Sequence, residues 1–234
     1  MLLNEKLLIM KNRSIQNVII AMMLAGNLHV CAQGFVNLNF ESANVPVVPA
    51  GQLGTNVLVS QGIPGWTAYE GLMQVSQIGH NDVSLGGPYL SIQGPQWNSA
   101  QILVGNYTML IQGSFGGAPS GSAAIGQSGL VPIATQSLQF ISNPGSNFQV
   151  TFNNQIIPII PINSFPNFTL FGGDISLFAG QSGELRFTGL ANGGGLLDSI
   201  IFSASSIPEP SIYSLLGCGV LLFGAARATF KRRQ

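Results

Sequence analysis

The sequence predicts an all-β fold of the β-sandwich or jelly-roll class. Charged residues make up 7% of the 234 residues, and 30 residues are glycine. This composition suits short strands joined by tight turns, because glycine accepts the positive φ angles that turns require. Between residues 35 and 206, short apolar runs alternate with polar residues, which is the period-two pattern of half-buried strands. Many short strands without helices between them indicate a sandwich.

The expected strands are separated by Gly, Pro, Asn and Ser, the usual turn residues. They cover residues 35–40, 89–92, 107–112, 137–141, 148–152, 156–160, 168–171, 184–188 and 199–203. Residues 113–121, which are rich in glycine, are expected to form a long loop. The two Gly-Gln-Ser-Gly segments at 126–129 and 180–183 are expected to be turns.

Basic residues gather at the two ends of the chain, and only Arg186 lies between them. The body from 33 to 206 therefore has one basic residue against six acidic ones: Glu41, Glu70, Asp82, Asp174, Glu184 and Asp198. This balance argues against nucleic-acid binding, which needs clustered Lys and Arg to neutralise phosphates. The two cysteines, Cys31 and Cys218, lie in the apolar end segments. The body is therefore expected to be stable on its apolar core, without a disulfide framework.

Residues 1–32 have the layout of a secretory signal peptide. Basic residues come first, an apolar run covers 18–25, and the small residue Ala32 precedes Gln33. Signal peptidase is expected to cleave between Ala32 and Gln33. Translation starts at Met1 or at Met10, since the second start gives a more ordinary basic region. Two alternatives remain open, a lipoprotein anchored through Cys31 and a buried core helix.

Residues 207–234 carry three features in a fixed order. Pro208, Glu209 and Pro210 come first, an apolar run covers 212–226, and a basic cluster closes the segment at 231–233. As a helix, residues 212–230 would be about 28 Å long at about 1.5 Å per residue, close to the bilayer core of about 30 Å. The basic cluster favours a cytoplasmic end. A C-terminal transmembrane helix is therefore expected.

This tail resembles the PEP-CTERM sorting signal of Gram-negative bacteria. The resemblance implies that an exosortase in the inner membrane recognises Pro208, Glu209 and Pro210 and processes the chain nearby. The product would then be released or attached outside the cell. The alternative is a plain single-pass anchor behind a proline linker.

The body resembles the galactose-binding-like jelly-roll family. The resemblance is carried by residues 39–41 (Asn-Phe-Glu), 64–66 (Pro-Gly-Trp) and 197–202 (Leu-Asp-Ser-Ile-Ile-Phe). It implies that the first and last strands lie close together, so that Glu41 and Asp198 meet and hold a structural calcium ion, a cation that takes six to eight oxygen ligands. The alternative is a pair of solvent-facing carboxylates at strand ends.

Few residues of the body suggest catalysis. His80, in the segment Gly79-His80-Asn81-Asp82, is a candidate base, but a turn is the simpler interpretation. A zinc site would need further His or Cys, and no Gly-x-Ser-x-Gly nucleophile elbow occurs. The chain is therefore expected not to be an enzyme.

Sugar binding is the better alternative, because sugar faces stack on exposed aromatic rings. The available aromatic residues are Trp66, Tyr69, Tyr89, Trp97 and Tyr107, of which Trp97, Tyr69 and Trp66 are the named candidates, and many Asn and Gln side chains could pair with sugar hydroxyls. Trp97 is the best exposed candidate, while Trp66 is also expected to suit core packing.

The sequence thus predicts an exported, non-catalytic surface or matrix protein, held in the inner membrane before processing. The alternative is a carbohydrate-binding module for extracellular polysaccharide. Calcium is the one cofactor expected, and nucleic acid is excluded as a partner.

Overall fold

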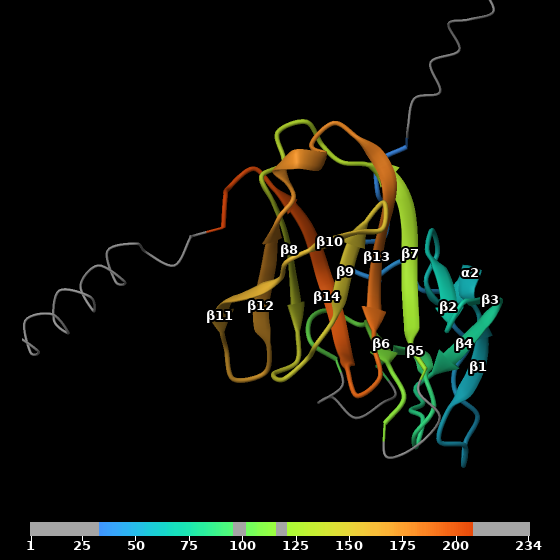
Figure 1. The fold of residues 1–234 in the computed structure, drawn as a ribbon. Helices are drawn as coiled ribbons and strands as arrows, with labels where there is room; N and C mark the ends of the chain where they lie inside the picture. The colour runs from blue at the N-terminus through green and yellow to red at the C-terminus, as the bar shows by residue number, and fades with distance from the viewer. Residues whose placement is uncertain (1–32, 96–101, 116–120, 208–234) are drawn as a thin grey trace, which may run out of the picture. The chain divides into compact units, whose positions relative to one another are not determined.

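The computed structural model describes residues 33–95, 102–115 and 121–207. The elements below belong to the compact unit that begins at Gly34. Two β-sheets dominate it, and Figure 1 shows them stacked on each other, with β1 to β5 gathered on one side of the molecule. The prediction of an all-β sandwich is confirmed.

The larger sheet has eight strands. In spatial order they are β1 (Thr55–Leu58), β4 (Gln77–His80), β5 (Tyr89–Gln93), β6 (Thr108–Gln112), β14 (Gly194–Ser203), β8 (Ser137–Ser142), β12 (Thr169–Asp174) and β11 (Ile160–Ser164). The pair β4–β5 is parallel, and the other neighbours are antiparallel.

The smaller sheet has six strands, all antiparallel. Their order is β10 (Gln155–Ile157), β9 (Gln149–Phe152), β13 (Ser182–Gly189), β7 (Ala123–Leu130), β2 (Thr67–Glu70) and β3 (Met73–Val75). The helices among the described residues are short: α2 (Val59–Gly62) and the 3-10 turn η2 (Ser176–Phe178). None of them is long and apolar enough to cross a membrane. The expected transmembrane helix at 212–230 lies outside the described residues.

Aromatic side chains join the two sheets in one apolar core. Phe140 of β8 and Phe187 of β13 come from opposite sheets, and their rings meet edge to face with centroids 5.2 Å apart. Both are almost fully buried. Each such ring removes a large apolar area from water, and the edge-to-face geometry is the one that aromatic quadrupoles favour. Burial alternates along β9 and β13, as the period-two pattern predicted, whereas β5, β6 and β7 are buried along most of their length.

Most of the expected strands are present, with bounds shifted by a few residues. Residues 156–160 are an exception: Pro158 and Ile159 separate β10 from β11, which lie in different sheets. Pro158 has no N–H to give to a ladder, so it breaks the run. The turn expected at 126–129 is wrong as well, because these residues lie inside β7. There, Gly126 leaves room for the Glu184 side chain of the neighbouring strand.

The expected strand at 35–40 is also wrong. Asn37 and Phe40 have φ angles of 49° and 59°, which lie outside the extended region. The segment nevertheless lies along the last strand, because the backbone N–H of Ile200 donates to the Leu38 carbonyl at 2.9 Å. The rings of Phe35 and Phe202 also stack, with centroids 4.9 Å apart. The closeness of the first and last segments is therefore observed without regular strand pairing.

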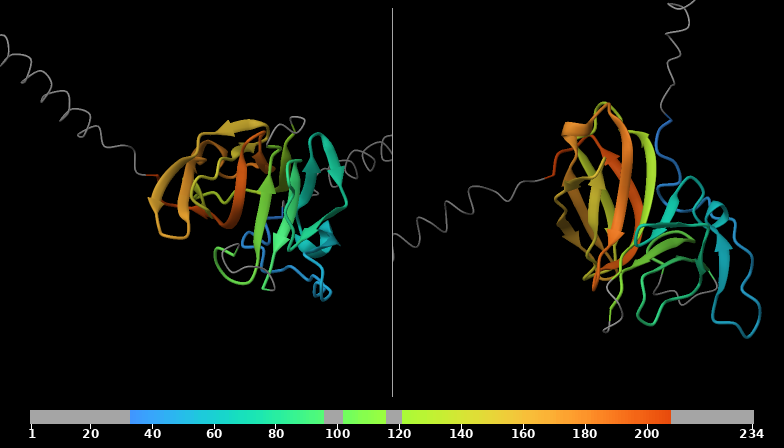
Figure 2. Two further views of the ribbon diagram at one scale, coloured as in Figure 1. Left: turned by 90° about the horizontal axis from the view of Figure 1, so that it is seen from below. Right: turned by 45° about the vertical axis from the view of Figure 1, so that its right-hand side comes forward.

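Figure 2 shows β1 to β5 from two further directions, as a cyan and green group beside the stacked yellow and orange strands. This group contains strands of both sheets. The hairpin β2–β3 belongs to the smaller sheet, while β1, β4 and β5 belong to the larger one. A single residue, Ser76, connects β3 to β4, so the chain crosses between the sheets at this point.

Candidate functional site

Glu41 holds one side of the loop between residues 103 and 108. Its Oε1 atom accepts hydrogen bonds from the backbone N–H groups of Asn106 at 2.8 Å and Tyr107 at 3.1 Å. Its Oε2 atom accepts from the Asn106 side-chain amide at 3.1 Å. Gly105 permits this approach, because its φ is +70° and a Cβ there would collide with the Glu41 carboxylate. Both oxygens of Glu41 are thus engaged by the loop.

Asp198 holds the other side of the same loop. It is 1% exposed, and its Oδ2 atom accepts a hydrogen bond from the Thr108 hydroxyl at 2.8 Å. Its Oδ1 atom accepts from the backbone N–H of Ser199 at 2.6 Å. Burial raises the pKa of Asp198 to about 6, although hydrogen bonds from Thr108, Ser199 and Val104 act in the opposite direction. Ser199 itself has a φ of 49° and lies in the register shift of β14.

The structure therefore brings Glu41 and Asp198 to the same loop. Every carboxylate oxygen of the pair accepts a hydrogen bond from an N–H or O–H donor. Calcium would bind these same oxygens, and an ionised carboxylate offers about four acceptor sites on its two oxygens. Among the described residues, no group of three or more His, Cys, Asp or Glu side chains could hold a metal. The calcium ion expected at Glu41 and Asp198 stays a prediction.

Trp66 belongs to the core and not to a surface platform. It is 5% exposed, and its ring lies 5.9 Å from Phe40 and 6.5 Å from Phe187, centroid to centroid. Its indole N–H donates to the Asn37 carbonyl at 3.0 Å. A sugar cannot reach a face of this ring, so the sugar-stacking interpretation of Trp66 is wrong.

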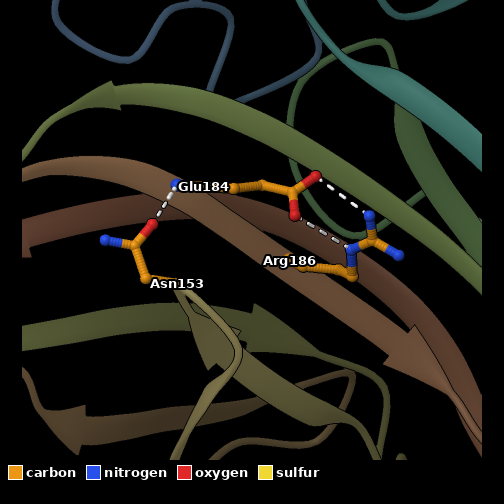
Figure 3. Close-up of polar contacts among 3 residues, drawn as sticks. All are labelled: Asn153, Glu184 and Arg186. Carbon is orange, nitrogen blue, oxygen red and sulfur yellow. Dashed lines mark hydrogen bonds and ion pairs between the residues drawn. The ribbon is translucent and has the colours of Figure 1, made fainter.

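Tyr69 lies on the outer face of the smaller sheet, but a cation covers its ring. The guanidinium carbon of Arg186 lies 4.0 Å from the ring centroid. Arg186 also bonds to Glu184 through Nε at 3.3 Å and through a terminal nitrogen at 3.0 Å. Figure 3 shows this fork, together with Asn153, whose side-chain oxygen accepts from the Glu184 N–H at 3.0 Å. Tyr69 therefore offers at most its other face to a ligand.

The remaining predicted residues fall largely outside the described part of the chain. Trp97, Ala32 and the sorting residues Pro208, Glu209 and Pro210 all lie there. Gln33 is described and exposed.

His80 is the last residue of β4 and is 3% exposed. Burial lowers its pKa below the usual value of 6.5, while a hydrogen bond with the Pro46 backbone acts in the opposite direction. Its Nδ1 atom has no hydrogen-bond partner among the described residues. The burial of this imidazole keeps it away from any substrate in solvent, which counts against His80 as the candidate base. The turn expected here starts one residue later, at Asn81, whose φ is 53°.

A polar cleft lies between the β2–β3 hairpin and strands β1, β4 and β5. It is an open hollow of about 460 Å³, and small-molecule sites usually have about 300 to 1,000 Å³. Its polar lining consists of amide, hydroxyl and carboxyl side chains: Asn56, Glu70, Gln74, Ser76, Gln77 and Tyr89. We call it the hairpin cleft.

Tyr89 forms the aromatic wall of the hairpin cleft. Its ring lies over Gly79 of the neighbouring strand, and a Cβ at Gly79 would come within 2.5 Å of the Tyr89 hydroxyl. That hydroxyl donates to the Asp82 carboxylate at 3.2 Å. Burial and the charges of Asp82 and Glu70 raise the pKa of Tyr89 to about 12. The cleft therefore has a negative potential and a phenol that stays protonated.

A second hollow lies between the sheets near Phe148 and Phe171. It has a volume of about 110 Å³, and Phe140, Phe148 and Phe171 are among its lining residues. This volume is below the usual range for ligand sites. The hairpin cleft is therefore the better candidate site.

Sequence reasoning missed the hairpin cleft because it did not predict β1 to β4. Residues 67–80 mix polar and apolar side chains in strands of three or four residues, too short for a clear alternation. The one available signal was the cluster of amides at Gln74 and Gln77 beside Glu70.

No protein-family model, curated protein or solved structure matches this chain.

Proposed function

We propose that this chain is an exported, non-catalytic protein of the cell surface or extracellular matrix, sorted by an exosortase through Pro208, Glu209 and Pro210. The observation that carries the proposal is the order of features in residues 207–234: the Pro-Glu-Pro motif, the apolar run and the basic cluster. The body has the matching character. It is an all-β sandwich that holds one basic residue among its described residues.

The contacts at the two ends of the sandwich support this division. Gly34 forms a parallel bridge with Leu130 of β7, two residues after the expected cleavage site. At the other end, the Ser137 hydroxyl donates to the Ser205 carbonyl at 2.7 Å, three residues before Pro208. Removal of residues 1–32 and of the tail would therefore leave these end contacts of the sandwich in place.

Processing of the full chain in its native bacterium tests the proposal. Pulse-labelled chains should shorten in two steps, one at each end. The Pro208→Ala and Pro210→Ala double variant should keep the C-terminal segment and remain in the membrane fraction, whereas the neighbouring Ser211→Ala variant should be processed normally. Normal processing of the double variant would contradict sorting through this motif.

Carbohydrate binding is the second candidate function, and the hairpin cleft is the observation that favours it. Amide and hydroxyl side chains are the groups that pair with sugar hydroxyls, and a tyrosine supplies apolar area with a polar end. The galactose-binding-like jelly roll belongs to the same proposal, supported by the two stacked sheets and by the first segment lying along β14. A structural calcium ion at Glu41 and Asp198 belongs to the same proposal, and it would share those oxygens with the hydrogen bonds from protein donors.

A glycan array probed with the secreted chain tests this second function. Binding should weaken in the double variant Gln74→Ala, Gln77→Ala, whose amides line the cleft. The matched control is Gln52→Ala, which removes an exposed amide outside the cleft. Equal loss in both variants, or no binding of any glycan, would contradict a sugar site in the hairpin cleft.

A further inference from the structure

The hairpin cleft is negatively charged, and this property restricts the sugars that suit it. Glu70 lies on its wall, and the Glu70 carboxylate makes no hydrogen bond or ion pair with any described residue. Asp82 lies behind the Tyr89 hydroxyl, which donates to it. Two carboxylates thus act on one side of a cleft whose lining includes no basic residue.

The rest of the body does not offset this charge. Between residues 33 and 206, one arginine and six carboxylates give a formal net charge of −5. The arginine, Arg186, is paired with Glu184 at 3.0 Å and stacked on Tyr69, so its charge is neutralised locally. An anionic polysaccharide would meet repulsion without a compensating cation.

A ligand for this cleft therefore needs hydroxyl groups for the amides and a positive charge for the carboxylates. Asn56, Gln74 and Gln77 offer both donors and acceptors, because each side-chain amide carries an oxygen and an NH₂ group. An ionised Glu70 carboxylate can accept hydrogen bonds but cannot donate them. A protonated amine makes the strongest hydrogen bonds to such a carboxylate, because both groups are charged.

We infer that the hairpin cleft binds a polysaccharide of amino sugars with free, protonated amines, with Glu70 receiving the amine and the Asn56, Gln74 and Gln77 amides receiving the hydroxyls. This inference rests on the proposed carbohydrate-binding function and specifies its ligand class. Tyr89 holds the wall of the site through its bond to Asp82, and it lies close to β4 because residue 79 is glycine.

The test compares glucosamine oligosaccharides with fully acetylated oligosaccharides of the same length, by calorimetry on the secreted chain. The charged oligosaccharide should bind more tightly, and its affinity should fall as salt screens the carboxylates. Alginate fragments, which are anionic, should not bind. An oligolysine peptide serves as a probe of charge alone and should bind more weakly than the amino sugar.

Variants assign the effect to one side chain. Glu70→Gln should weaken binding of the glucosamine oligosaccharide roughly three- to fivefold, the range for a partly exposed ion pair, and should leave the weaker binding of the acetylated oligosaccharide unchanged. Asp174→Asn removes the same charge from an exposed residue at the end of β12 and should change neither. A folded Gly79→Ala variant should lose affinity for both sugars, because the added methyl group displaces Tyr89.

The outcomes separate this inference from the broader function. Equal binding of both sugars, or an unchanged affinity in Glu70→Gln, would overturn the amino-sugar assignment while leaving a carbohydrate site intact. Binding of oligolysine as tight as that of the sugar would show that charge alone is recognised. If no sugar binds, the carbohydrate-binding function itself fails.

Discussion

The Gln127 side chain pairs with both backbone groups of Val36. The Val36 N–H donates to Gln127 Oε1 at 2.6 Å, and Gln127 Nε2 donates to the Val36 carbonyl at 3.0 Å. Gln127 lies in β7 and is 5% exposed. A side-chain amide thus replaces a strand neighbour for the first segment of the body, which explains how residues 34–40 can pack without forming a strand.

We expect Gln127→Ala to destabilise the sandwich by about 1 to 3 kcal/mol, because two part-buried hydrogen bonds would be lost, each worth about 0.5 to 1.5 kcal/mol. The measurement is urea unfolding of the purified chain. Gln52→Ala, which truncates an exposed glutamine, serves as the control and should change stability by less than about 0.5 kcal/mol. Equal stability of the two variants would show that water satisfies Val36 as well as Gln127 does.

The sequence predicted the strands that are apolar runs bounded by turn residues, as in β5, β6, β8, β12 and β13. It failed where local chemistry depends on distant partners. The alternation of residues 35–40 is genuine, but Gln127, more than 80 residues away, makes a turn-rich path possible. Similarly, Gly126 suggests a turn when it is considered alone. In the structure it is needed in β7 because a Cβ at this position would collide with the Glu184 side chain.

The candidate site was less predictable than the fold. Glu41 and Asp198 were correctly placed near each other, but the sequence could not show that N–H and O–H donors of residues 106–108 and 199 would occupy their oxygens. Trp66 packs in the core, which was the alternative to sugar stacking. Its indole N–H can be buried because it donates to the Asn37 carbonyl inside the domain. The hairpin cleft depends on strands too short to recognise, so tertiary contacts alone define it.

Asp198 should make the sandwich more stable in mild acid. Its pKa in the folded state is about 6, against 3.8 as the ordinary value, so the folded state binds a proton more tightly than the unfolded state. The stabilisation of the folded state by Asp198 is complete below about pH 4 and is lost as the pH rises through 6. The melting temperature of the wild type minus that of Asp198→Asn should therefore fall between pH 4 and 7.

Comparison with Asp174→Asn supplies the control for Asp198. The Ser176 N–H donates to Asp174 and lowers the pKa of that carboxyl, so its contribution is lost only as pH falls below 3.8. The wild-type minus Asp174→Asn difference should stay flat between pH 4 and 7. A rising difference for Asp198 would show that its hydrogen bonds outweigh its burial.

His80 should have the opposite effect on stability: it should make the folded state less stable as the pH falls from 7 to 5. Burial lowers its pKa below 6.5, so the unfolded state binds the proton more tightly. Its contribution to stability is complete above pH 6.5 and is lost as pH falls towards the folded-state pKa. His80→Gln should therefore show a smaller loss of melting temperature between pH 7 and 5 than the wild type. An identical loss in both proteins would mean that the imidazole is solvated in the folded state.

Glu41 should control the local order of the loop that it shares with Asp198. In Glu41→Gln, an amide replaces the carboxylate, so the charge-assisted bonds to the Asn106 and Tyr107 N–H groups weaken. Hydrogen exchange should become faster at these two amides, by roughly tenfold for a loss of about 1.4 kcal/mol in local opening free energy. Amides of β8 and β13, which are interior strands of the two sheets, should exchange at the wild-type rate. Gly105→Ala should have the same local effect by a different route, because its Cβ would push the carboxylate away. Unchanged exchange at Asn106 and Tyr107 in both variants would show that Asp198 and Thr108 hold the loop without Glu41.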